Sequence, residues 1–541
     1  MALAGRSVGT GEGLQMKRSL ISRATRMLGT FLGLCLMLSA CSLEDMLRLS
    51  GQPVVEQDQA ADRAPDGSDG ARPDDGAEDS TNEATDPDDT TVVDTGEDSG
   101  RDTGGGEETG QNEAEPPTIP SLPVDCDHVI PTTVEEVDGD SSYSDVEPGD
   151  TVCIAAGVRG PLELRNFHGA SGQTITFVNR GGVVDIRGSD DDYAGIQIED
   201  SDHIRVTGAG LSRQCGADVA PQAQRCGIRI LGPAHSVTGK SRTEYLAVDH
   251  VEMGDTTQSA VSIKDNSLGR GEWIEHDIVL NHNYIHDVHD EGVYIGSSDY
   301  ATGDYHVLDG VHLGHNLVID TGRDGLQVGS ATRACTIHHN IVRKSGQNNE
   351  SSHRAGVMNN KGSVCDIYNN LIADTAGWGI YVQGNGTNKL YNNVVVRAGG
   401  SVRVGDGDGD GISIHDGSNV DGSIYVWNNT VVEARGDGIG WGNDVGSDNQ
   451  ILNNIVIASG GTNIDKDENV QVGRNFAAQT VAAAQFVDAA TDDYRLRPQS
   501  PAKDAGAALH DRGVVEDYDG VPRPQGSAFD IGAYELRSSQ G

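Results

Sequence analysis

The chain has 541 residues, enough for several ordinary domains, yet only 4% of them are aromatic while 72 are glycine. A conventional globular core of this length needs more large side chains, whereas a solenoid of many tight turns does not. The formal net charge of −44 excludes nucleic acid as a partner, because little in this balance would neutralise phosphates.

The N-terminal residues have the pattern of an export sequence. Four basic residues between positions 17 and 26 precede an apolar run, Met27 to Leu38, that is too short for a comfortable transmembrane helix. The following Leu-Ser-Ala-Cys, ending at Cys41, resembles the cleavage site of bacterial lipoproteins, which implies lipidation of Cys41. It implies a signal peptide over residues 1–41, with Met16 as the start. Since Ser42 follows the cysteine, it also implies an outer-membrane or cell-surface location, with the lipid as the sole membrane contact. An ordinary signal peptide with an incidental cysteine is the alternative.

Residues 42–123 have the composition of a disordered acidic linker. Between Val55 and Glu115 there are 21 acidic residues and 3 arginines, with almost no large apolar side chain. Such a segment cannot bury enough surface to offset the entropy of ordering, and its like charges extend it. We therefore expect a stalk between the membrane and the folded part.

Two short sequence motifs, which we call words, recur along the rest of the chain. The first, as in Leu280–Ile285 and Ile451–Val456, has an asparagine between aliphatic residues, and a glycine word such as Glu291–Ile295 or Asp437–Trp441 follows it. The repeated asparagines are Asn283, Asn316, Asn340, Asn370, Asn393, Asn429 and Asn454, separated by 23 to 36 residues. Aliphatic and polar residues alternate within the words, which is strand periodicity. A period near 25 residues with variable insertions predicts one coil of short strands per repeat, with the asparagines stacked as an amide ladder.

Six cysteines remain after the signal sequence: Cys126, Cys153, Cys215, Cys226, Cys335 and Cys365. An even number in an exported protein favours disulfides, and the spacing suggests sequential pairs. Cys335 and Cys365 each lie five residues before a repeated asparagine, so stacked coils would bring them within disulfide reach. Two buried thiols are the alternative.

These words resemble the repeats of bacterial right-handed parallel β-helix proteins of the pectate-lyase-like kind. The opening segment Val146–Ile154 and the closing segments Ser500–Gly506 and Phe529–Glu535 resemble the same superfamily. The resemblance implies an all-β, right-handed parallel β-helix over residues 124–485, with a C-terminal capping segment over 486–541. It leaves activity open, because this scaffold serves lyases, hydrolases, epimerases and adhesins.

We expect one stripe of exposed side chains to point outward from the glycine words. It consists of Tyr294, Gln327, Met358, Tyr381 and Ser413, and it is a natural track on which sugar rings could stack. Polar residues flank the stripe on neighbouring coils. Together the expected substrate-binding residues are Asp290, Glu291, Tyr294, Asp324, Gln327, Tyr381 and His415.

The flanking residues offer two kinds of chemistry. A lyase acting on a uronate needs a base for the C5 proton and a cation for the carboxylate. The candidate cations are Arg323, Arg354 and Lys361, and the candidate bases are His353 and His289. Hydrolysis would need two carboxylates, which Asp290 or Glu291 could provide with Asp324. The alternative is that all of these are solvated turn residues.

A glycine-rich loop offers a candidate metal site. Asp406, Asp408 and Asp410 alternate with glycines, and three carboxylates on a flexible backbone suit Ca²⁺. A flexible acidic insertion is the alternative.

The sequence thus predicts a lipid-anchored surface protein whose β-helix binds a polysaccharide or cell-surface glycan and cleaves it by lyase-type chemistry. A non-catalytic module for adhesion or glycan binding is the other hypothesis.

Overall fold

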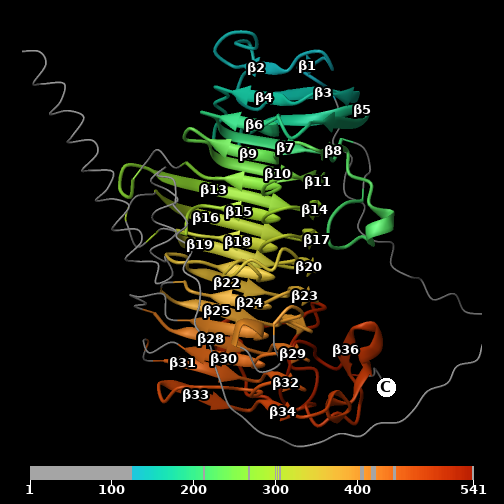
Figure 1. The fold of residues 1–541 in the computed structure, drawn as a ribbon, viewed down its shortest axis with the longest axis vertical. Helices are drawn as coiled ribbons and strands as arrows, with labels where there is room; N and C mark the ends of the chain where they lie inside the picture. The colour runs from blue at the N-terminus through green and yellow to red at the C-terminus, as the bar shows by residue number, and fades with distance from the viewer. Residues whose placement is uncertain are drawn as a thin grey trace, which may run out of the picture. The chain divides into compact units, whose positions relative to one another are not determined.

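The described part of the chain, in a computed structural model, covers residues 125–538 apart from 211–213, 266–268, 299, 301–302, 304–305, 385, 403–406, 416–421, 443–445 and 447. The expected signal peptide, Cys41, the whole acidic linker and Asp406 lie outside these residues. The described residues form the predicted right-handed parallel β-helix (Figure 1).

From β7 (Asp202–Thr207) to β30 (Ile439–Gly442), each coil of the β-helix contributes three strands. In one coil, β13 (Ile274–Asn281) is followed by a corner, β14 (Tyr284–Val288), a short turn and β15 (Val293–Ile295). The chain then returns and begins the next coil with β16 (Val307–Gly314), which pairs in parallel with β13. Like positions therefore lie over like positions from coil to coil.

Among the described residues, sheet A has 23 strands in two rows joined by the long strands β3 and β5, and sheet B has 11. The first row of sheet A contains β1 (His128–Ile130), β3 (Thr151–Arg159), β5 (Ile175–Arg187), β7 (Asp202–Thr207), β10 (Glu244–Asp249), β13, β16, β19 (Ala331–His338), β22 (Cys365–Tyr368), β25 (Asn388–Tyr391), β28 (Ile424–Trp427), β31 (Asn449–Leu452) and β33 (Val470–Gly473). The second row contains β8 (Ile228–Leu231), β11 (Val251–Thr256), β14, β17 (Leu317–Thr321), β20 (Ile341–Arg343), β23 (Leu371–Ala373), β26 (Val394–Val396), β29 (Thr430–Val432), β32 (Ile455–Ile457) and β34 (Phe476–Ala478). Sheet B contains β2 (Glu136–Asp138), β4 (Leu162–Arg165), β6 (Ala194–Glu199), β9 (His235–Lys240), β12 (Val261–Ile263), β15, β18 (Leu326–Val328), β21 (Val357–Asn359), β24 (Ile380–Val382), β27 (Ile412–His415) and β30 (Ile439–Gly442).

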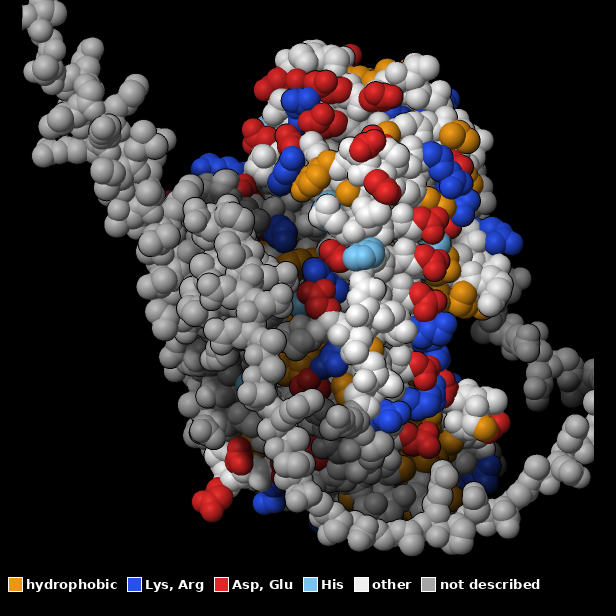
Figure 2. Space-filling model, viewed as in Figure 1, with side chains coloured by type: hydrophobic (Ala, Val, Ile, Leu, Met, Phe, Trp, Pro, Cys, Tyr) orange, Lys and Arg blue, Asp and Glu red, His pale blue; other side chains and the backbone are white. Residues whose placement is uncertain are grey.

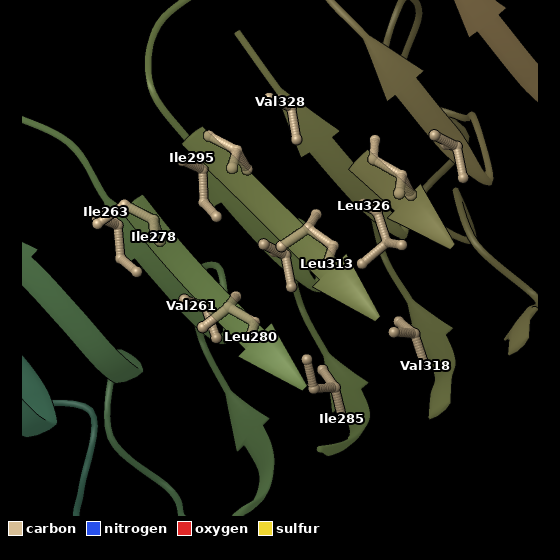
Figure 3. Packing of buried hydrophobic residues seen from close by; sticks show 14 of the residues in the cluster. Val261, Ile263, Ile278, Leu280, Ile285, Ile295, Leu313, Val318, Leu326 and Val328 are labelled. Carbon is tan, nitrogen blue, oxygen red and sulfur yellow. The ribbon is translucent and has the colours of Figure 1, made fainter. Parts of the chain in front are cut away.

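The core lies between the sheets and is built of stacked aliphatic side chains. On sheet B, Val261 and Ile263 point inward, and Leu326 and Val328 repeat them two coils further on (Figure 3). All four are fully buried. Because successive residues of a strand face opposite sides, the residue between each such pair points out of the β-helix.

The predicted asparagine ladder runs along the corner between the two rows of sheet A. The amide of Asn340 donates to the Asn370 Oδ1 and to the carbonyl of Leu313, at 3.0 and 2.9 Å. Its own Oδ1 accepts from the Asn316 backbone and side-chain nitrogens, both at 3.0 Å. The same pattern continues through the seven predicted positions, and Asn475 extends it by one coil. Each ladder amide from Asn316 to Asn454 is therefore satisfied by the amides above and below it.

Three disulfides pair the six cysteines sequentially, as Cys126–Cys153, Cys215–Cys226 and Cys335–Cys365. Cys335 and Cys365 are register partners on β19 and β22, as the spacing indicates. The Cys215–Cys226 bond closes a loop that leaves the regular coils between β7 and β8. We call such loops excursions.

The C-terminal segment packs on the outside of the second row. It contains the antiparallel pair β35 (Phe486–Asp488) and β36 (Asp493–Leu496). Apolar residues that point outward from β26, β29 and β32, such as Val394, contact this segment and are buried by it. Asp492 holds it in place through ion pairs with Arg343 and Arg397 at 3.2 and 2.8 Å.

Helical structure in the described residues is limited to single 3₁₀ turns, none of which is long or apolar enough to cross a membrane. These turns are Pro221–Ala223, Gly407–Gly409, Val481–Ala484, Ala489–Thr491 and His510–Arg512.

Replacing one ladder residue tests how much the stacked amides contribute. Asn340→Ala leaves buried partners on both neighbouring coils unpaired, each costing about 1–3 kcal/mol. We expect the free energy of unfolding, measured by chemical denaturation, to fall by roughly 3–5 kcal/mol. Asn281→Ala is the matched control, because Asn281 lies on the same corner but outside the ladder, and it should change stability by less than about 0.5 kcal/mol. Equal effects of the two substitutions would contradict a ladder that stabilises the fold.

Candidate functional site

The outward stripe on sheet B is in the predicted register. Tyr294 pairs with Gln327, Gln327 with Met358, Met358 with Tyr381, and Tyr381 with Ser413. The expectation that these side chains are exposed is wrong for four of them, since Gln327, Met358, Tyr381 and Ser413 are each at most 8% exposed. Neighbouring side chains bury part of the stripe. The Trp378 ring, for example, packs on the Tyr381 ring with the ring centroids 4.3 Å apart.

Gln327 is the most unusual member of the stripe. It is fully buried, and among the described residues neither its amide oxygen nor its amide nitrogen has a hydrogen-bond partner. An unpaired buried amide is costly to the folded state.

Hollows lie along the outer face of sheet B, toward the N-terminal and the C-terminal coils from the middle of the stripe. Two adjoining hollows of about 330 and 250 Å³ share Tyr193, Ser262 and Lys264, and the second extends to Tyr294 and Arg323. The Lys264 ammonium lies 4.0 Å from the centre of the Tyr294 ring. Acidic and basic side chains interleave on the face seen in Figure 2. The hollows follow the axis along which the coils stack, as a linear polymer would require.

Four residues from three neighbouring coils meet beside the upper hollows, and we call them the acid–histidine cluster: Glu291, Arg323, Asp324 and His353. Each comes just before a strand of sheet B, so the stacking of β15, β18 and β21 brings them together. The His353 Nδ1 lies 3.4 Å from the Asp324 Oδ2 and 3.6 Å from the Glu291 Oε1. The sequence predicted these residues individually, and the coil register makes them one site.

Burial sets the protonation of the cluster. Asp324 is fully buried, which raises the pKa of its carboxyl to about 6. The same carboxylate raises the pKa of His353 above its ordinary value of 6.5, because it stabilises the imidazolium. The His353 side chain is 34% exposed, and Nδ1 faces the carboxylates, so Nε2 lies on the opposite side of the ring. Asp324 therefore orients a histidine that solvent can reach.

Arg323 is held by carboxylates on three sides. Its guanidinium pairs with both oxygens of Glu350, at 2.7 and 3.1 Å, and lies 3.5 Å from Asp290 and 3.7 Å from Glu291. This fork-to-carboxylate geometry is the one by which arginine recognises carboxylate ligands. Glu350 is exposed and comes from an excursion, so its carboxylate occupies a place that a substrate carboxylate could take.

The other candidates for catalysis lie apart from this cluster. Arg354 is buried and bonds to Asp408 at 2.5 Å and to Asn349 at 3.0 Å. Lys361 follows β21, so it lies at the opposite end of that strand from His353. His289 is exposed and contacts Asp290 at 2.9 Å.

A third hollow of about 420 Å³ lies lower on the same face. Its wall includes Trp378, Tyr381, Trp441, Asp408, Asp410, His415, Asp437 and Asp465. Burial raises the pKa of Asp410 to about 7, and the pKa of Asp437 is also raised. Asp410 lies closely over Gly440, where a Cβ would lie 2.3 Å from the Asp410 Oδ2, so a larger residue would have to displace this carboxylate.

The expected Ca²⁺ loop remains a prediction. Asp406 lies outside the described residues, Asp408 pairs with Arg354, and the Asp410 Oδ1 accepts a bond from the Asp437 backbone nitrogen at 2.7 Å.

Residues that sequence reasoning missed include Tyr193, Lys264, Asp437 and Trp441. Asp437 could have been found, because it precedes the glycine of its word just as Glu291, Asp324 and Asp410 do. The residues that precede the glycine in successive words form one column along the β-helix, and four of the six are acidic. We call this column the acid column: Glu291, Asp324, Ala355, Trp378, Asp410 and Asp437. Within it, Asp324 accepts the Ala355 backbone N–H at 2.6 Å, and Asp437 accepts that of Thr462 at 2.6 Å.

Comparison with known proteins found likeness among solved structures alone. No family model matches the chain, and no curated protein matches it. Among solved structures, the pectate lyase Pel9A is 12% identical and covers 76% of this chain and 97% of its own, with a TM-score of 0.43. An alginate lyase from Paenibacillus is 16% identical (65% and 98%, TM-score 0.36), and a lacto-N-biosidase from Eubacterium ramulus is 11% identical (66% and 68%, TM-score 0.38). Likeness at this level assigns neither an activity nor a substrate.

The coupling of Asp324 to His353 can be measured directly. In the wild type we expect an NMR titration of His353 to give a pKa above 6.5, and in Asp324→Asn a lower pKa, because the neutral amide no longer stabilises the imidazolium. Asp437→Asn is the matched control from another part of the acid column. A pKa of His353 that is unchanged in Asp324→Asn would contradict the assigned contact.

Proposed function

We propose that the sheet B face binds a polysaccharide along the β-helix axis and cleaves it by lyase-type chemistry at the acid–histidine cluster. One observation carries this proposal: a half-buried His353, oriented by the buried Asp324, lies beside an arginine that already holds a carboxylate. The adjoining hollows, with Tyr193 and Tyr294 in their walls, provide room and ring surfaces for sugar units on either side.

The residues of the cluster can divide the work of β-elimination. His353, when neutral, takes the proton from C5 of a uronate, and the electron pair forms the C4–C5 double bond. The C4–O bond breaks, and the leaving oxygen takes a proton from water; the hydroxide that remains takes the C5 proton from the His353 imidazolium, which restores water and the neutral base. Arg323 binds the uronate carboxylate in place of Glu350 and stabilises the charge that develops there. Since the pKa of His353 is raised, cleavage should increase as the pH rises above 6.5.

The charge of the protein limits the substrate. A chain of net charge −44 repels a densely charged polyanion, and Asp290, Glu291 and Glu350 surround Arg323. A polysaccharide with widely spaced uronates fits these surroundings better than a continuous polyuronate.

A second candidate is hydrolysis at the lower hollow. Asp410, with a pKa of about 7, is partly protonated at neutral pH, as a general acid must be. Asp437 is the adjacent carboxylate of the acid column, and three aromatic side chains line the same wall. Two carboxylates and ring surfaces are the parts a glycosidase uses.

Product analysis with two variants separates these activities. On a panel of polysaccharides, lyase cleavage gives unsaturated products absorbing near about 235 nm, and His353→Gln should lower their formation at least about 100-fold while Asp410→Asn retains it. New reducing ends without that absorbance, lost in Asp410→Asn but not in His353→Gln, would instead establish hydrolysis. Binding of a glycan with no product at any pH would overturn both and leave a non-catalytic glycan-binding or adhesion module.

In this proposal the protein is exported and anchored through lipidated Cys41 on the outer membrane or cell surface. The support is the lipoprotein-like sequence before Cys41 and the three disulfides, which suit an oxidising compartment.

Two cysteine variants test the anchor. Cys41→Ser should abolish incorporation of labelled palmitate and release the protein from the membrane fraction, because no thiol remains at the cleavage site. Cys35→Ser is the matched control, since Cys35 lies in the apolar run that is removed. Palmitate incorporation in Cys41→Ser would contradict the assigned site.

A further inference from the structure

A column of histidines lies on the outside of the corner that carries the asparagine ladder. His282, His315 and His339 each precede a ladder asparagine and have left-handed φ angles of 53 to 55°. Their rings stack with centroids 4.7 and 4.8 Å apart, and His250 continues the stack at 5.3 Å. On the lower coils asparagine holds the same left-handed position, at Asn369, Asn392, Asn428 and Asn453. Asparagine therefore adopts the left-handed backbone conformation of this corner as well as histidine does. The conformation alone does not explain why the upper coils carry histidine.

Two further side chains approach this stack from the side. Asp218 belongs to the excursion closed by the Cys215–Cys226 disulfide, and its Oδ2 lies 3.3 Å from the His315 Nδ1 and 3.7 Å from the His282 Nε2. The backbone nitrogen of Ala217 donates to the His315 carbonyl at 2.8 Å, which fixes the excursion against the corner.

The second side chain that approaches the histidine stack is that of His338, the last residue of β19. Its ring is nearly perpendicular to those of His315 and His339, at 86° to each. Its Nδ1 lies 3.0 Å from the Nδ1 of His339. On its other side the His338 ring stacks on Tyr368 of the next coil, with the ring centroids 5.1 Å apart.

These contacts define two groups of potential metal ligands that share His315: His315 with His338 and His339, and His315 with Asp218 and His282. Within each group the ligand atoms lie within 4.8 Å of one another. A tetrahedral Zn²⁺ ion with bonds near 2.1 Å holds its ligands about 3.4 Å apart, so small side-chain rotations would suffice.

The groups around the cluster suit a cation. The carboxylate of Asp218 lies against His315 and His282, and a metal ion takes a carboxylate and the neutral form of each imidazole as ligands. The Asn369 amide lies 3.1 Å from the His339 Nε2, and amide groups can either donate to such a nitrogen or accept from its N–H.

We propose that this corner binds one divalent transition-metal ion of the Zn²⁺ type through His315, His338 and His339, with Asp218 turning from its contact with His315 to become the carboxylate ligand. Imidazole nitrogens with one carboxylate are a donor set for Zn²⁺ rather than for Ca²⁺ or Mg²⁺. Bound there, the ion ties the disulfide-closed excursion to the coils of β16 and β19. The site is on the ladder corner, separate from the sheet B face.

The full-length chain, freed of metal by a chelator, allows a direct test. Titration with Zn²⁺ against a chromophoric chelator should give one ion per chain at micromolar or tighter affinity, and Co²⁺ in its place should give the visible absorbance of a nitrogen-ligated tetrahedral ion. Thermal unfolding should shift to higher temperature at saturating Zn²⁺, since binding stabilises the folded state.

His315→Asn places at this corner the residue that the lower coils carry, so the fold should be retained while Zn²⁺ affinity falls at least 100-fold. Asp218→Asn should weaken binding by a smaller factor. His203→Asn is the matched control, because His203 is also left-handed and stacked, on Tyr245, but lies outside the cluster. It should bind Zn²⁺ as the wild type does.

Two results would overturn the proposal. One is the absence of one-to-one binding at micromolar Zn²⁺. The other is binding that persists in His315→Asn, including binding that is lost in His353→Gln, since Glu291, Asp324 and His353 form another group of potential ligands.

Discussion

The fold depends on in-register parallel stacking, in which every position of one coil lies over the same position of the next. A buried amide at a corner, such as that of Asn340, can be satisfied in this arrangement by identical amides above and below it. The repeat therefore reinforces its own register, because a shift by one residue would leave each amide unpaired and turn the aliphatic side chains outward. The Cys335–Cys365 disulfide joins equivalent positions of two coils and reinforces the same register.

Features that follow from this stacking could be predicted from the sequence. The asparagine corners, the parallel coils, the stacked cysteines and the order of the outward stripe all repeat in the chain, so their spacing specifies them. Asn475 was missed because its word has arginine in place of the preceding asparagine or histidine. The burial of Gln327 and Tyr381 was also missed, since it depends on side chains and excursions that vary from coil to coil.

Contacts made by the excursions could not be predicted. Sequence spacing brings Asp324 and His353 to neighbouring coils, but it does not specify that Arg354 turns away to Asp408. Likewise, no repeat places Asp218 beside His315, because the Cys215–Cys226 excursion has no equivalent on other coils. The regular coils thus provide fixed columns of side chains, and the irregular excursions decide which members of a column are paired.

The acid column shows how the same stacking can serve both stability and chemistry. In Asp324 and Asp410, one carboxylate oxygen accepts a backbone N–H from the next coil, which fixes the side chain and satisfies a buried donor. The second oxygen is then held in a defined direction, toward His353 in one case and over Gly440 in the other. Burial, which the structural role requires, is also what raises the pKa of both carboxyls toward neutrality. A carboxyl that stabilises the coil in this way therefore also has a pKa suited to acid–base chemistry. What a catalytic site needs besides is a partner residue, which an excursion can supply.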